Sequence, residues 1–116
     1  MTNSPGAIAT VGKYISDVTA TVSQQLESSS ASDEVKNLMK QLSEQMAAID
    51  PSVSPAKVEQ MGSDLKTLSD EMAKAEPRQK WYQISLEGIK EAAIAIGETA
   101  KPIVDIVAKL LPLLVP

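Results

Sequence analysis

The chain has no cysteine, no histidine and no phenylalanine among its 116 residues. Without cysteine there are no disulfides and no thiol nucleophiles, and without histidine there is no imidazole base for a catalytic dyad or triad. The two absences together remove the usual ligands of zinc. We therefore predict that the protein is not an enzyme, and the sequence predicts no catalytic, cofactor-binding or metal-binding residues.

Aromatic residues are also scarce, and neither sign of charge is in large excess. Aromatic residues make up 3% of the chain, and the formal net charge is −4. A modest charge of mixed sign does not create the field that attracts nucleic acid, so we expect no nucleic-acid partner. No run of about 18 uncharged apolar residues is present, and residues 1–25 lack the apolar segment of a signal peptide. These absences predict a cytoplasmic location.

Aliphatic residues repeat at heptad spacing in two central segments, which predicts two amphipathic helices. Ser32 is the expected N-cap of the first helix, and Ser54 with Pro55 is the expected start of the second. Because the connection between them is short, the helices should form an antiparallel hairpin over residues 32–76. The repeating residues are Val35, Leu38, Leu42, Met46 and Ile49, followed by Val58, Met61, Leu65, Leu68 and Met72.

The N-terminal segment is ambiguous between helix and strand over residues 7–26. Ile8, Val11, Ile15, Val18 and Val22 fit a helix, but the valine and threonine content also fits a strand. No second strand is available in the chain, so we predict a helix. Residues 1–31 then form an N-terminal helix and a serine-rich linker, and the helix docks on the hairpin, exchanges with a neighbouring chain or stays mobile.

The C-terminal segment from Trp81 to Pro116 is almost entirely aliphatic or small, with its charges on one narrow stripe. Pro102 should bend this segment, but no Ser, Thr, Asp or Asn directly precedes it to cap a new helix. We therefore predict one long kinked apolar helix over residues 78–111, with Pro112 ending regular structure.

The sequence thus predicts an all-α protein, in which residues 32–116 form a small helical bundle. The apolar face of the C-terminal helix is wider than the hairpin can cover, which indicates a further contact with a second copy or another helical protein. We predict a non-enzymatic interaction or self-association module. The predicted interaction surface consists of Trp81, Ile89, Ile96, Ile103, Val107, Leu110 and Leu114.

Carboxylates are the only abundant reactive groups, and they have an ordinary interpretation. Pairs such as Asp70 and Glu71 are expected on the solvent side of their helices, and Asp70 with Lys74 has the spacing of a surface ion pair. A membrane-associated helix is the alternative function, because Trp81 and Tyr82 lie next to basic residues. Acidic residues dominate the polar stripe of the helix, however, and weaken attraction to anionic lipid.

The segment KWYQISLEGIKEAAIAIGETAKPIVDIVAKLL, which follows the hairpin, resembles helical modules at the ends of uncharacterised bacterial proteins, notably cyanobacterial ones. The resemblance covers about Asp33 to Leu114 and consists of a helical pair, an aromatic residue, a small-residue helix and a proline. It implies an accessory or interaction module and transfers no functional residues.

Overall fold

The computed structural model describes the backbone of residues 5–50 and 52–115, with side chains from Thr10 onward. The described residues contain no strand, so the all-α prediction is confirmed, and the ambiguous segment 7–26 is helical. The elements are α1 (Pro5–Ser28), α2 (Asp33–Ala48), α3 (Pro55–Met72), α4 (Gln79–Ile96), the 3₁₀ turn η1 (Glu98–Ala100) and α5 (Lys101–Leu114).

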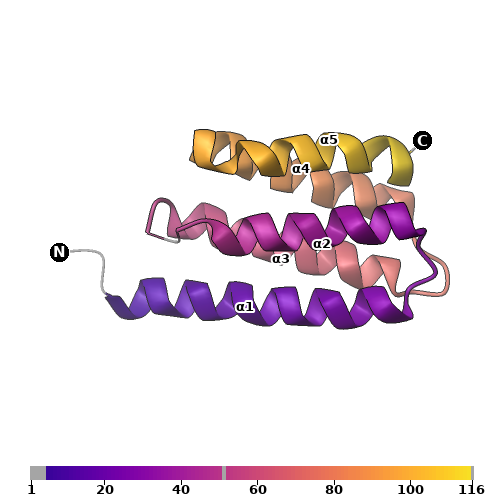
Figure 1. Cartoon of the computed structure of the whole chain (residues 1–116), viewed down its shortest axis with the longest axis horizontal. Coiled ribbons are helices and arrows are strands. Elements are labelled where there is room, and N and C mark those ends of the chain that lie inside the picture. Colours follow the sequence, from indigo (N-terminus) through magenta and orange to yellow (C-terminus); the bar gives the residue numbers. More distant parts are fainter. Residues whose placement is uncertain (1–4, 51, 116) are drawn as a thin grey trace.

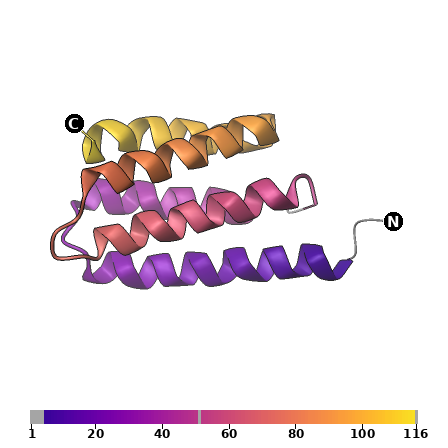
Figure 2. The same cartoon turned by 180° about the vertical axis from the view of Figure 1, so that it is seen from behind.

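The helices form three layers, with α1 in the first, α2 and α3 in the second, and α4 and α5 in the third (Figure 1). Each helix runs antiparallel to the one before it, as the view from behind also shows (Figure 2). The closest packing joins α1 to α3, α3 to α4, α4 to α5, α5 to α2, and α2 back to α1. The five helices of the described residues therefore form a closed ring of neighbours around one core.

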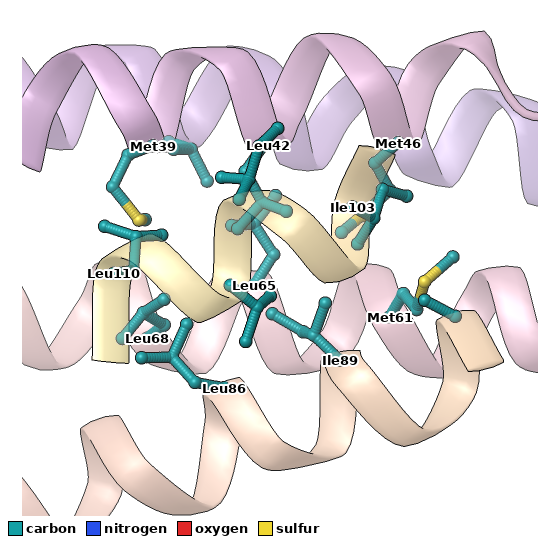
Figure 3. Close-up of a cluster of buried hydrophobic side chains, with 14 of the residues drawn as sticks. Met39, Leu42, Met46, Met61, Leu65, Leu68, Leu86, Ile89, Ile103 and Leu110 are labelled. Atoms are coloured by element: carbon teal, nitrogen blue, oxygen red, sulfur yellow. The ribbon is translucent and has the colours of Figure 1, made fainter. Parts of the chain in front are cut away.

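The predicted hairpin of α2 and α3 is antiparallel, but its two helices approach each other closely at few positions. Their heptad residues point into a core that α4 and α5 complete (Figure 3). The layer of α4 and α5 lies on one side of the gap between α2 and α3, and α1 lies on the other. The side chains that meet in this core are Met39, Leu42, Met46, Met61, Leu65, Leu68, Leu86, Ile89, Ile103 and Leu110.

The N-terminal helix is docked, which decides among the three outcomes left open by the sequence. Val11, Ile15, Val18, Val22 and Leu26 are all buried, and they follow one stripe of α1. Helix α3 accommodates this stripe through a glycine. A β-carbon added at Gly62 would lie 2.6 Å from the Cδ1 atom of Ile15, so α1 and α3 are already in close contact there.

The prediction of one kinked helix over residues 78–111 is wrong, because the chain turns back at Gly97. Gly97 has φ +112°, a left-handed conformation that glycine adopts at no steric cost. The turn η1 then leads into α5 through Ala100, which makes no side-chain capping bond. Pro102 lies in the first turn of α5, where its missing N–H has no helical partner to lose.

Other helix ends agree with the sequence only in part. The Ser32 side chain accepts a hydrogen bond from the Val35 backbone N–H at 3.3 Å, so this N-cap is confirmed. Ser54 occupies the N-cap position of α3 without a side-chain capping bond. Pro112 does not end α5, which continues to Leu114. The proline lies near the end of the helix, so its missing N–H and its ring disturb few backbone hydrogen bonds of α5.

Candidate interaction surface

Four of the seven residues predicted for the interaction surface lie in the core. Ile89, Ile103, Val107 and Leu110 are at most 1% exposed within a single chain. They are covered because α5 folds back on α4 and packs against α2, an arrangement that a single long helix could not make. These four residues are therefore not available to a partner while the bundle is closed, and the predicted surface must be corrected.

The other three predicted residues do not form one surface. Trp81 lies in the first turn of α4 and Leu114 in the last turn of α5, whereas Ile96 ends α4. All three are half-buried. The guanidinium carbon of Arg78 lies 5.6 Å from the centroid of the Trp81 ring, a cation–π contact that holds the start of α4. Trp81 therefore has a structural role at this helix start.

The large apolar side chains that remain most exposed on α4 are two isoleucines. Ile84 is 46% exposed and Ile94 is 60% exposed. They lie on different flanks of the helix. A β-carbon added at Gly88 would meet the carboxylate of Asp64 in α3, so the flank of α4 that contains Gly88 and Ile84 faces α3. By helical spacing, Ile94 lies on the opposite flank, next to α5.

Helix α5 contributes a line of uncharged side chains beside Ile94. Val104 and Leu111 are half-buried and Ala108 is exposed, at helical steps of four and three. This line lies on the layer of the bundle farthest from α1 (Figure 1). We define the hairpin outer face as the surface made by Glu87, Lys90 and Ile94 of α4 with Val104, Ala108 and Leu111 of α5.

The two charged residues of the hairpin outer face have no ion-pair partner within the described part of the chain. Glu87 accepts a hydrogen bond from the side-chain amide of Gln83 at 3.3 Å. The ion pairs between described residues instead join Lys66 to Asp70, and Lys74 and Arg78 to Glu71. Glu87 and Lys90 thus remain available for ion pairs with another molecule.

Glu71 is a buried carboxylate that the sequence analysis wrongly placed in solvent. Its Oε1 atom lies 3.0 Å from Nζ of Lys74, and its Oε2 atom accepts a hydrogen bond from the Arg78 backbone N–H at 2.8 Å. Burial alone would raise the pKa of Glu71, but these hydrogen bonds and the charge of Lys74 lower it to about 2. Lys74 therefore pairs with Glu71 rather than with Asp70, and the cluster fixes the turn from α3 to α4.

A second polar cluster holds α1 against α3. The Gln25 side-chain amide donates to Asp70 Oδ1 at 2.6 Å, and its carbonyl oxygen accepts a hydrogen bond from the Ser69 hydroxyl. Asp70 also pairs with Lys66, at 3.5 Å. Each group in this cluster has a partner within the chain, so we interpret the cluster as a helix-docking contact rather than as a binding site.

The described residues contain no group of three or more Asp and Glu residues that could hold a metal ion. None of their helices combines the length and the hydrophobicity needed to cross a membrane. The alternative of a helix lying on a membrane needs Ile89, Ile103 and Leu110 to face lipid, whereas the closed bundle buries them. That alternative would require the bundle to open.

The described residues form a small all-α bundle. Its hairpin outer face combines apolar side chains with an acidic and a basic residue that have no ion-pair partner in the described part of the chain. No protein-family model, curated protein or solved structure matches the chain. The resemblance to bacterial C-terminal modules therefore stays a prediction. The sequence contained one signal for the hairpin outer face, which is the charge-free spacing of Val104, Ala108 and Leu111. This spacing could not be recognised as a surface signal, because almost every residue of the C-terminal segment is apolar or small.

Proposed function

We propose that this protein is a non-enzymatic self-association module with a cytoplasmic location, and that copies of the chain meet through the hairpin outer face. The observation that carries the proposal is the 60% exposure of Ile94 beside the uncharged line of α5. A single exposed isoleucine is ordinary on a protein surface, but one that extends a line of apolar side chains is typical of a contact surface.

Four residues of the interaction surface predicted from the sequence have a different role. Since Ile89, Ile103, Val107 and Leu110 complete the core, they stabilise the fold and position α4 and α5 side by side. Self-association then requires no opening of the bundle. Only the outward side chains of two helices come into contact, which suits a reversible association of modest affinity.

The test compares two isoleucine substitutions on the same helix. Ile94→Lys places a charge on the hairpin outer face, and Ile84→Lys places the same charge on the flank of α4 that faces α3. Multi-angle light scattering of the full chain from low to high micromolar concentration gives the mass in solution. We expect the wild-type chain and Ile84→Lys to associate, and Ile94→Lys to associate at least about tenfold more weakly, because each dimer would lose two buried side chains.

A wild-type chain that stays at its monomer mass of 12.3 kDa over the whole concentration range would refute the proposal. Equal loss of association in both variants would show that a different surface makes the contact. Circular dichroism of both variants checks that the helices remain folded.

A further inference from the structure

The charges of the hairpin outer face are arranged symmetrically. A second copy of the chain that packs on this face in the antiparallel direction would place opposite charges against them. In α4 the outward residues Gln83, Glu87, Lys90 and Ile94 follow steps of four, three and four. This spacing is symmetric about a point between Gly88 and Ile89. When two such helices run antiparallel over this point, Glu87 of each copy lies opposite Lys90 of the other.

The neighbouring flank of α5 has a similar spacing. Val104, Ala108 and Leu111 of the helix follow steps of four and three, and Val115, the residue directly after the helix, continues the spacing by four. In an antiparallel pair, Val104 lies opposite Val115 of the second copy, and the small Ala108 lies opposite the large Leu111. Side chains of alternating size interdigitate well, so the α5 half of the face is complementary to itself in shape. The α4 half is complementary to itself in charge.

The two halves are compatible with one dimer. The centre of symmetry lies roughly two helical turns before the end of α4 at Ile96, and roughly two turns after the start of α5 at Lys101. Because α4 and α5 are packed neighbours, one twofold axis across the hairpin passes through both centres. The hairpin outer face is thus self-complementary about a single axis, as an isologous interface must be.

We propose that two copies of the chain associate through the hairpin outer face with α4 antiparallel to the partner's α4 and α5 antiparallel to the partner's α5, with Glu87 of each copy paired to Lys90 of the other. This inference rests on the proposed self-association. A twofold axis parallel to the helices would instead place Glu87 and Lys90 against the uncharged line of α5. Two charges would then be buried without partners, which disfavours that arrangement.

The arrangement predicts an unusual response to charge reversal. Glu87→Lys alone places two lysines opposite each other at both contacts of a homodimer, and Lys90→Glu alone places two glutamates opposite each other. A mixture of the two variants restores an opposite-charge pair at both contacts. We therefore expect each variant alone to dimerise roughly tenfold more weakly than the wild type, and the mixture to form heterodimers.

The experiment mixes equal amounts of full-length Glu87→Lys and ¹⁵N-labelled Lys90→Glu, and native mass spectrometry counts the species. The matched control mixes Glu59→Lys with ¹⁵N-labelled Lys57→Glu. These variants change the net charge equally but lie at exposed positions of α3. Heterodimers well above the statistical half in the first mixture, and at about half in the control, are the expected result.

Statistical pairing in both mixtures would overturn the antiparallel arrangement and leave self-association intact. The same excess of heterodimers in the control would also overturn it, since net charge alone would then explain the pairing. A wild-type chain that never dimerises would instead refute the proposed function itself, so the two failures are distinguishable.

Discussion

At the scale of single residues, Glu71 connects three parts of the turn between α3 and α4. Its carboxylate accepts a hydrogen bond from the Arg78 backbone N–H and also contacts the side chains of Lys74 and Arg78. Tyr82 lies near this cluster, and burial together with the negative charge of Glu71 raises the pKa of its hydroxyl. The carboxylate therefore helps to fix the turn through which the chain enters α4.

Glu71→Gln should lower the free energy of unfolding at neutral pH, because glutamine preserves the size of the side chain but not its charge. The pKa of Glu71 is about 2 in the folded chain and near 4.5 when unfolded. A lowered folded pKa adds stability above about pH 4.5, and this stability is lost as the pH falls from about 4.5 to 2. Urea unfolding between pH 2 and 7 should show the difference between wild type and variant shrinking over that window.

The control for this prediction is Glu44→Gln, which alters an exposed carboxylate of α2. It should change the unfolding curve little at any pH. A difference between Glu71→Gln and wild type that is the same at pH 3 and pH 7 would show that the charge of Glu71 is not what stabilises the turn.

Heptad periodicity predicts the environment of single residues correctly where one face of a helix is buried. Val58, Leu65 and Leu68 lie on the heptad stripe of α3 and are fully buried. The environment of Glu71 could not be predicted in this way, because a carboxylate next to Asp70 near a helix end normally faces water. The loop after α3 folds back over Glu71, and the positions of Lys74 and Arg78 around it depend on that tertiary path rather than on local spacing.

At the scale of helices, two glycines mark close approaches of different kinds. Gly62 of α3 faces the packed side chain of Ile15, whereas Gly88 of α4 faces the carboxylate of Asp64. Asp64 is half-buried, and burial raises its pKa. A carboxylate at the edge of the core can turn toward water, but an isoleucine inside the core cannot move without disturbing its neighbours.

Gly62→Ala should therefore destabilise the fold by about 1–2 kcal/mol, since overpacking of a core costs about 1–3 kcal/mol and alanine recovers part of this through helix propensity. Gly88→Ala should be close to neutral, because the Asp64 carboxylate can move aside. Chemical unfolding of the two variants under one condition measures the difference. Greater stability of Gly62→Ala than of Gly88→Ala would contradict the close packing of α1 on α3.

Helix starts were predictable where a capping residue or a proline marks them, as at Ser32 and Pro55. The turn at Gly97 could not be predicted for a physical reason. The sequence does not reveal that Gly97 adopts a positive φ, and this conformation lets the chain reverse. The missing polar cap before Pro102 argued for a continuous helix, whereas the turn η1 provides another way to begin α5.

At the scale of the whole molecule, association and stability are linked. If copies of the folded chain associate, the midpoint of thermal unfolding should rise with protein concentration, because the dimer forms only from folded chains. Differential scanning calorimetry over a hundredfold range of concentration measures this shift. Ile94→Lys should show little or no shift, and Ile84→Lys should behave like the wild type. A midpoint independent of concentration in the wild type would argue against association.

The fold class followed from the sequence, but the arrangement of the helices did not. Heptad spacing in α2 and α3 predicts two amphipathic helices, and a short connection predicts that they are antiparallel. Neither signal states how far apart the helices lie. That separation depends on α1 entering from one side and the pair α4 and α5 from the other, and these are contacts between segments distant in sequence.

The position of α2 in the ring has a consequence for synthesis on the ribosome. Its two closest neighbours are α1 and α5, so the helix depends on segments made before it and long after it. The nascent chain can form individual helices as it emerges, but the contacts of α2 cannot be completed until α5 has left the exit tunnel. We therefore expect folding to be late and all-or-none rather than sequential from the N-terminus.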